Sequence, residues 1–174
     1  MQDPNVQLWC EDEVHFQRHG SLIRMWFPKG EQPNLLAPSC RDKVAFMGAL
    51  NLKTGSLETQ ETPTFSALNF SGFVRQLLQV TRNHIYLILD NARWHRAQAL
   101  HDFFSSLRGR LTLLFLPPYS PDLNPIERVW RITRRKATHN RYFASVSELR
   151  SALVTQFQHW QSPNSFLKVL CANL

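Results

Sequence analysis

The sequence predicts a mixed α/β fold, with one five-stranded sheet and helices on both of its faces. The first observation is an N-terminal series of strand patterns with no helical pattern between them. The second is that two short apolar segments then alternate with helical patterns, as strands buried on both faces do. The third is the length of 174 residues, which predicts one domain with a sizeable core. We therefore expect residues 1–174 to form a single domain.

Apolar alternation and turn signals locate the strands. Strands are predicted at residues 6–12, 21–27, 43–52, 84–90 and 111–116. Turns are predicted at residues 18–20 and 53–55, and residues 55–60 are expected to pair back onto the preceding strand. The proline-containing segment 28–42 is predicted to be an irregular loop. Apolar residues at helical spacing predict helices at residues 67–82, 96–107, 124–139, 145–160 and 164–170.

Charge and composition narrow the class of protein. The net charge of +7 favours a polyanionic partner, although charge alone is a weak signal. No apolar run has the length that a bilayer requires, and residues 1–5 lack the features of a signal peptide. We therefore expect a soluble, intracellular protein without a membrane partner. Cys10, Cys40 and Cys171 have no paired spacing, so we expect three reduced thiols and neither a zinc site nor a disulfide framework.

Two aspartates stand where the chain leaves predicted strands. Asp12 ends the strand at residues 6–12, and Asp90 ends the strand at residues 84–90. Ligands of open α/β sheets collect beyond the carboxyl ends of strands. Two adjacent carboxylates repel each other, so such a pair needs a cation or a raised pKa, and Mg²⁺ prefers oxygen ligands of this kind.

Each aspartate also has an ordinary explanation. Asp90 fits a turn after a strand, and Asp12 fits a surface carboxylate within the acidic run of residues 11–13. Glu13 is a rival to Asp12 as a site residue. Strand alternation puts Asp12 and Glu13 on opposite faces, and the pattern leaves open which face carries the site.

A third acid, Glu127, stands at a predicted helix start. Asn124 suits the N-cap, Pro125 suits the first helical position, and Glu127 is then the third residue. Glu127 could close a capping box onto Asn124, or it could reach forward to a metal ion. Helical spacing puts Glu127 on one face with Trp130, Arg131 and Arg134.

The same helix is rich in cations. Its basic residues are Arg128, Arg131, Arg134, Arg135 and Lys136. Such a face could place these side chains on phosphates. A solvated basic face is the ordinary alternative, but such a face normally contains interspersed acids.

Two motifs, LDNARWH at residues 89–95 and LPPYSPDLNPIE at residues 116–127, resemble those of the DDE transposases of the mariner superfamily, especially the bacterial insertion-sequence branch. The second motif is long and specific. Residues 9–16, with their Asp-Glu pair, look like the first-strand motif of that family, which favours Asp12 over Glu13. Residues 26–30 look like the end of its second strand. The resemblance covers nearly the whole chain.

The resemblance implies a ribonuclease H-like fold and metal-dependent phosphoryl transfer on DNA. Asp12, Asp90 and Glu127 would hold two Mg²⁺ ions, for which Mn²⁺ could substitute, while Asn91 and His95 would stand beside them. The reaction would cut the transposon ends and join the freed 3′-hydroxyl to target DNA, typically at TA.

The implied partners are the transposon ends, target DNA and a second copy of the chain in the synaptic complex. An N-terminal helix-turn-helix domain is expected to be absent here, and could be encoded separately. The expected location is the bacterial cytoplasm, at the nucleoid. The alternatives are a non-catalytic DNA-binding or regulatory remnant of a transposase, and a nuclease acting on RNA–DNA hybrids.

Overall fold

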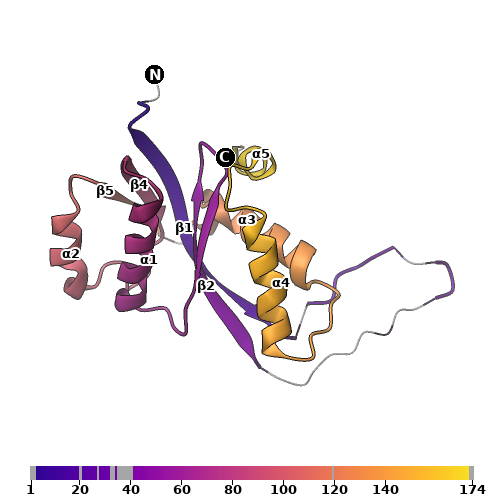
Figure 1. Ribbon diagram of the computed structural model, residues 1–174. Coiled ribbons are helices and arrows are strands. Elements are labelled where there is room, and N and C mark those ends of the chain that lie inside the picture. Colours follow the sequence, from indigo (N-terminus) through magenta and orange to yellow (C-terminus); the bar gives the residue numbers. More distant parts are fainter. Residues whose placement is uncertain are drawn as a thin grey trace.

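A single five-stranded sheet forms the centre of the computed structural model, which describes residues 3–19, 21–26, 28–31, 34, 41–118 and 120–172 (Figure 1). The strands are β1 (Val6–Gln17), β2 (Lys43–Asn51), β3 (Leu57–Glu61), β4 (His84–Leu89) and β5 (Leu111–Phe115). Their order across the sheet is β3-β2-β1-β4-β5. The pairs β1–β2 and β2–β3 are antiparallel, whereas β1–β4 and β4–β5 are parallel. The predicted mixed five-stranded sheet is confirmed.

Helices cover both faces of the sheet, as predicted (Figure 1). They are α1 (Ala67–Val80), α2 (His101–Ser106), α3 (Ile126–Thr133), α4 (Val146–Gln158) and α5 (Ser165–Ala172), with short 3₁₀ turns η1 (Gln98–Leu100) and η2 (Pro121–Leu123) and a π-helical turn η3 (Arg134–Thr138). One core lies between the sheet and α1 with α2, and the other lies between the sheet and α3, α4 and α5. Strand alternation therefore divides the residues of β1 between two separate cores.

Side-chain caps set the starts of the two longest helices. Ser66 accepts a hydrogen bond from the backbone N–H of Asn69 at the start of α1, and Ser145 accepts one from Glu148 at the start of α4. The Glu148 carboxylate in turn accepts a hydrogen bond from the backbone N–H of Ala144. Each contact satisfies an N–H that has no partner within its helix.

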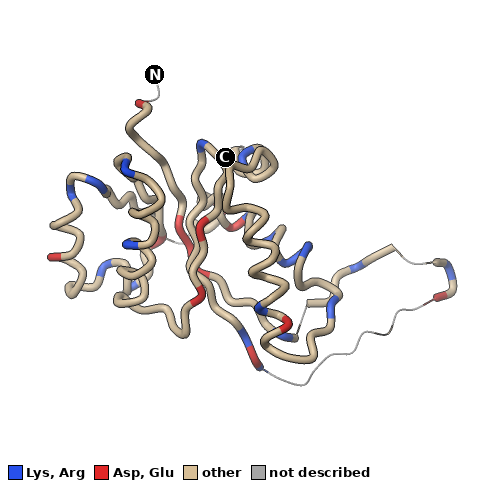
Figure 2. The backbone as a smooth tube through the Cα atoms, viewed as in Figure 1, with Lys and Arg blue, Asp and Glu red and all other residues tan. Residues whose placement is uncertain are grey.

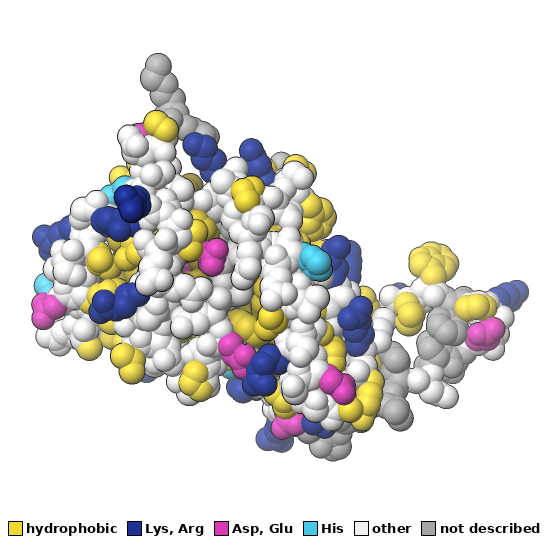
Figure 3. All heavy atoms as spheres, viewed as in Figure 1, with side chains coloured by type: hydrophobic (Ala, Val, Ile, Leu, Met, Phe, Trp, Pro, Cys, Tyr) yellow, Lys and Arg dark blue, Asp and Glu magenta, His cyan; other side chains and the backbone are white. Residues whose placement is uncertain are grey.

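The predicted strand at residues 21–27 is wrong for residues 21–26, which have no regular structure, while Phe27 lies outside the described residues. The third antiparallel strand is instead β3, the segment that was expected to pair back. The backbone of Ile23 is bonded at both its N–H and its carbonyl by the side chain of Asn140, at 2.9 and 3.1 Å. The apolar residues that suggested a strand are exposed: Leu22, Ile23, Met25 and Trp26. Exposed hydrophobic side chains stand on the part of the molecule that projects to the right in Figure 3.

Two predicted helices have different bounds in the structure. The helix expected at residues 96–107 begins at Gln98 as η1 and continues as α2. The helix expected at residues 124–139 is α for eight residues and then widens into the π-helical turn η3. Such turns are rare, and many lie at functional sites.

Two further expectations concern thiols and membranes. Cys10 and Cys171 are free and buried, while Cys40 lies outside the described residues. Among the residues that the structure describes, no helix combines the length and the apolar character needed to cross a bilayer.

The turn between β2 and β3 requires glycine at position 55. Gly55 has a φ of +74°, and a Cβ there would lie 2.1 Å from the carbonyl oxygen of Asn164. We predict that Gly55→Ala lowers the free energy of unfolding by about 1–3 kcal/mol or more, because strain and a backbone clash combine. Urea unfolding followed by circular dichroism measures the change.

Gly72→Ala in α1 is the matched control, because a Cβ at Gly72 meets no atom within 4 Å. That substitution should leave stability unchanged or raise it by roughly 0.5–1 kcal/mol, since alanine favours helix. Equal effects of the two substitutions would refute the proposed role of the turn.

Candidate active site

Asp12 lies within β1, not at its end. β1 continues to Gln17 because its second half still pairs with β2, where Asp12 stands opposite Gly48. The prediction that Asp12 ends its strand is therefore wrong. The parallel pairing with β4, however, stops at Cys10 opposite Ile88. Asp12 thus stands beside the point where the chain leaves β4, close to where Asp90 follows that strand.

Alternation along β1 separates the three consecutive acids. Asp12 shares its face with Cys10 and Val14, which pack in the core beneath α3. Glu11 and Glu13 point to the opposite face, toward His95. The structure therefore places Asp12, and not its rival Glu13, in the pocket described next.

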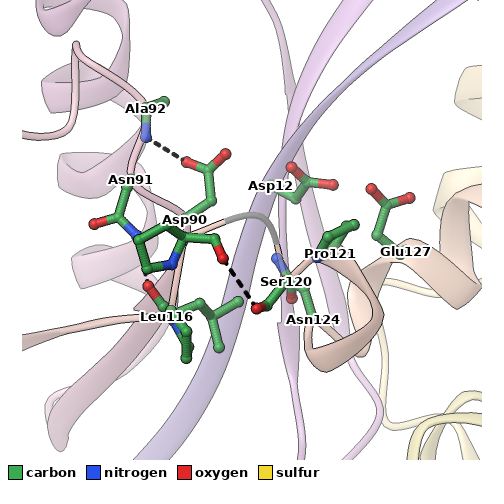
Figure 4. A pocket seen from close by; sticks show the side chains of 11 residues that line it. Asp12, Asp90, Asn91, Ala92, Leu116, Ser120, Pro121, Asn124 and Glu127 are labelled. Atoms are coloured by element: carbon green, nitrogen blue, oxygen red, sulfur yellow. Dashed lines mark hydrogen bonds between the residues drawn. The ribbon is translucent and has the colours of Figure 1, made fainter.

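Asp12, Asp90 and Glu127 line one pocket of about 440 Å³. Figure 4 shows Asp12 between the other two carboxylates, which approach from opposite sides. Three separate elements supply them: β1, the segment after β4, and the first turn of α3. The rest of the wall comes from the two sequence motifs: Asn91, Ala92, Leu116, Pro117, Pro118, Ser120, Pro121 and Asn124.

The carboxyl group of Asp12 is strongly perturbed. Burial, followed by repulsion from Glu127 and Glu13, raises the pKa of Asp12 from 3.8 to about 7. The indole N–H of Trp130 partly opposes this by donating to Oδ2 at 3.0 Å. Asp12 therefore ionises near neutral pH unless a cation stabilises its charge.

Asp90 has the opposite environment. Its side chain is 53% exposed, and Oδ1 lies 3.1 Å from Nδ1 of His95. The same oxygen accepts a hydrogen bond from the backbone N–H of Ala92 at 2.8 Å. The bond from His95, with a smaller effect from Ala92, lowers the pKa of Asp90 in spite of partial burial. Asp90 is therefore a carboxylate at neutral pH.

The start of α3 is built differently from the predicted capping box. Asn124 is extended and Pro125 is already helical, as expected of a helix boundary. The Asn124 side chain, however, donates to the carbonyl of Glu11 at 2.9 Å and caps no N–H of α3. Asn124 is almost fully buried, and it ties the helix start to β1. Glu127 makes no capping bond to Asn124 and lines the pocket instead.

A buried histidine occupies the opposite face of β1. Nε2 of His95 lies 3.0 Å from Glu13 Oε1 and 3.4 Å from Glu11 Oε2, while Nδ1 faces Asp90. Burial lowers the pKa of His95, but hydrogen bonds with Asp90 and Glu13 and the charges of the two glutamates outweigh it and raise the pKa to about 10. Burial also raises the pKa of Glu11.

This cluster has ligand atoms close enough to hold a metal ion, all within 4.8 Å of one another. A histidine that binds a metal ion must be neutral and must have a free ring nitrogen. Both ring nitrogens of His95 already face carboxylates, and the raised pKa keeps the ring protonated. The imidazolium is therefore itself the cation of this cluster.

The pocket fits a divalent cation better. Its three carboxylates are oxygen ligands of the type that Mg²⁺ and Mn²⁺ prefer. Asn124 Oδ1 is buried and has no hydrogen-bond partner among the described residues. The acidic segments of the central strands are flanked by helices that carry Lys and Arg (Figure 2).

The five basic residues expected to contact DNA fall into two groups. Arg131, Arg135 and Lys136 are exposed. Arg128 donates to the carbonyl of Leu170, and the Arg134 guanidinium lies 5.5 Å from the ring centre of Phe16. Within the face predicted from helical spacing, Trp130 is buried while Arg131 is exposed.

Asn91 and His95 both lie close to Asp90. Asn91 lines the pocket, its side chain donates to the carbonyl of Leu116, and its oxygen accepts a bond from Arg96. Sequence reasoning missed the part played by Trp130. One signal was available: a glycine inside a strand, at position 48, indicates that another group approaches closely.

The chain is similar in sequence to a known insertion-element protein. The chain is 26% identical over 158 residues to a 39 kDa protein of insertion element IS630 from Shigella sonnei, covering 90% of this chain and 46% of that protein. The chain thus spans about half the length of that relative.

Two solved structures share the fold. The Mos1 transposase in its paired-end complex superposes with a TM-score of 0.70 at 18% identity, covering 96% of this chain and 52% of that chain. The isolated catalytic domain of Mos1 mariner transposase superposes with a TM-score of 0.62 at 18% identity, covering 96% and 76%. The predicted ribonuclease H-like fold is confirmed.

The family itself is shown by sequence. The profile of the DDE superfamily endonucleases matches residues 7–150, which include all three carboxylates of the pocket. This chain belongs to the DDE superfamily of endonucleases.

Proposed function

We propose that this chain is the catalytic domain of an insertion-sequence transposase, which cuts and joins DNA by metal-dependent phosphoryl transfer. The observation that carries the proposal is the convergence of Asp12, Asp90 and Glu127 on one pocket. Family membership supports the endonuclease chemistry. Solved Mos1 complexes include one with a left transposon end and others with Mn and with Mg.

Each carboxylate has a distinct role in this proposal. Asp12 and Asp90 would hold two divalent cations, and Glu127 would hold one of them. When bound, such ions activate the attacking oxygen and stabilise the leaving oxygen of an in-line displacement at phosphorus. His95 orients Asp90 from behind, and Asn91 supports the wall of the pocket through Leu116.

The same pocket serves both steps of transposition, because only the nucleophile changes. Water first attacks a phosphodiester at the element end, and the 3′-oxygen leaves as a 3′-hydroxyl. That 3′-hydroxyl then attacks a phosphodiester of target DNA, and the 3′-oxygen of the target strand leaves. Arg131, Arg135 and Lys136 are the exposed cations on the catalytic helix and its π-helical extension, and they contact phosphates. A second copy of the chain, a separate helix-turn-helix domain and a location with the bacterial nucleoid belong to the same proposal.

The first prediction of this proposal concerns DNA cleavage. Asp90→Asn and Glu127→Gln should each lower Mn²⁺-dependent nicking of supercoiled plasmid DNA by about 100-fold or more, because each removes a metal ligand. Gel electrophoresis after incubation with Mn²⁺ measures the rate. Asp122→Asn is the matched control, since Asp122 is exposed near the pocket and outside its lining, and its rate should stay at the wild-type level.

Wild-type rates for both triad variants would refute the proposed site. Binding to DNA without any metal-dependent nicking by the wild-type chain would favour the alternative, a non-catalytic remnant. Preferential cutting of an RNA–DNA hybrid would favour a nuclease of that class.

The second prediction concerns pH. Asp12 ionises near 3.8 when unfolded and at about 7 when folded, so the folded chain binds more protons in between. Stability of the metal-free chain should therefore fall as pH rises from 4 to 7, by about 1.4 kcal/mol per pH unit at most from this group. Asp12→Asn should make the slope shallower by this contribution, while the buried Glu11 keeps its own contribution. Mg²⁺ should raise the melting temperature of the wild type more at pH 8 than at pH 5.

Differential scanning fluorimetry with and without Mg²⁺ tests both statements. Asp102→Asn is the control, because Asp102 is fully exposed on α2. A Mg²⁺ effect that is equal at the two pH values, or that survives Asp12→Asn, would count against Asp12 as a ligand.

The third prediction concerns His95. His95→Gln leaves Glu13 and Glu11 without their buried cation, so the free energy of unfolding should fall by roughly 3–5 kcal/mol. His84→Gln is the matched control, because His84 bonds only the carbonyl of Gly109 and the hydroxyl of Thr112, and should cost about 1 kcal/mol. Chemical denaturation compares the two, and equal losses would contradict the ionic role of His95.

A further inference from the structure

A buried tryptophan contacts the first carboxylate from behind. The indole N–H of Trp130 donates to Asp12 Oδ2 at 3.0 Å, and Trp130 is only 1% exposed. Trp130 does not line the pocket, whereas Asp12 does. A buried indole N–H needs an acceptor, and here the acceptor is a carboxylate of the site. The tryptophan can therefore reach the pocket only through Asp12.

Neighbouring aromatic rings hold the indole in this orientation. Trp130 meets Phe16 edge-on, with ring centres 6.5 Å apart and planes at 83°. It meets Phe157 on α4 in the same way, at 6.2 Å and 72°. Phe16 belongs to β1, the strand that carries Asp12. The donor is thus fixed to the sheet as well as to α3.

A glycine on β2 makes room for this ring. Gly48 stands opposite Asp12 in the β1–β2 pairing. A Cβ at Gly48 would lie 2.3 Å from Cη2 of Trp130 and 2.8 Å from its Cζ2. Gly48 is not among the glycines with positive φ, so its backbone conformation does not require glycine. Space for the indole is the reason why residue 48 lacks a side chain.

We propose that Trp130 is a positioning residue for Asp12, and that position 48 must be glycine so that the indole can reach Asp12. The N–H holds one oxygen of the carboxylate, so the other oxygen is presented to the pocket in one orientation. This inference rests on the proposed function, in which Asp12 binds a divalent cation. It adds two residues outside the pocket to the machinery that orients the first ligand.

The test compares two tryptophans. Trp130→Phe keeps an aromatic ring and removes the N–H. Trp9→Phe is the matched control, because Trp9 on β1 is also 1% exposed, but its N–H donates to the neutral side chain of Gln7. Mn²⁺ affinity, measured by electron paramagnetic resonance, should fall about tenfold in Trp130→Phe, as expected for losing a hydrogen bond to a charged group. It should stay within about twofold in Trp9→Phe.

A spectroscopic signature separates positioning from general support of the fold. In the chain labelled with ¹⁵N-tryptophan, the indole resonance that disappears in Trp130→Phe identifies Trp130. That resonance should shift when Mg²⁺ saturates the wild type and stay in place in Asp12→Asn. The positioning role would be overturned if the Trp130 indole resonance of the wild type does not shift with Mg²⁺. It would also be overturned if Trp130→Phe and Trp9→Phe bind Mn²⁺ with equal affinity.

The outcomes also distinguish this inference from the proposed function. If Asp12→Asn and Glu127→Gln bind Mn²⁺ as tightly as the wild type, the metal site itself fails and the positioning role falls with it. If those two variants lose binding while Trp130→Phe retains it, only the positioning role is refuted.

Gly48→Ala provides an independent geometric test. It leaves every donor and acceptor of the site in place but displaces the ring, so Mn²⁺ affinity should fall as in Trp130→Phe. Phenylalanine lacks the two indole carbons nearest to Gly48, so the double variant should be hardly less stable than Trp130→Phe alone. If the stability losses of the two single variants simply add up in the double variant, Gly48 and Trp130 do not belong to the same contact.

Discussion

Three consecutive carboxylates in the middle of a central strand are the constraint on which the rest of this structure depends. Glu11, Asp12 and Glu13 all lie within β1, and Glu11 is fully buried. Ionised groups in a protein interior are costly unless they are paired. Alternation sends Asp12 to one face and its two neighbours to the other, so each core must supply its own partners for negative charge.

The two faces meet this requirement in different ways. Behind the sheet, the His95 imidazolium lies between Glu13 and Asp90, and the cluster is closed to solvent on the His95 side. In front, Asp12 receives one hydrogen bond from Trp130 and otherwise faces Glu127 across an open pocket. The closed face contains a cation of its own, the His95 imidazolium, whereas the residues that line the open pocket include three carboxylates and no basic side chain. That excess of negative charge favours a bound cation. Burial, followed by repulsion from Glu127 and Glu13, raises the pKa of Asp12, whereas the hydrogen bond from His95 lowers the pKa of Asp90.

Local reasoning found the site residues for reasons that were only partly correct. The rule that ligands gather at strand ends located Asp90 correctly, but Asp12 is in mid-strand and reaches the same place because β4 stops beside it. The helix start at Asn124 was correct, while the capping box was wrong because Asn124 is used to bind β1. The apolar segment at residues 21–26 resembled a strand but has no partner strand in the structure.

The sequence by itself determined the α/β class and the central strands, and it selected Asp90 and Glu127 as candidate ligands, because hydrophobic period and long motifs are local properties. Only the tertiary structure decided which face of β1 carries the site, since alternation is symmetrical until α3 packs on one side. It also decided that Trp130 lies over Gly48 and that His95 meets the acids of β1. These contacts join residues far apart in the chain, so no local pattern could specify them.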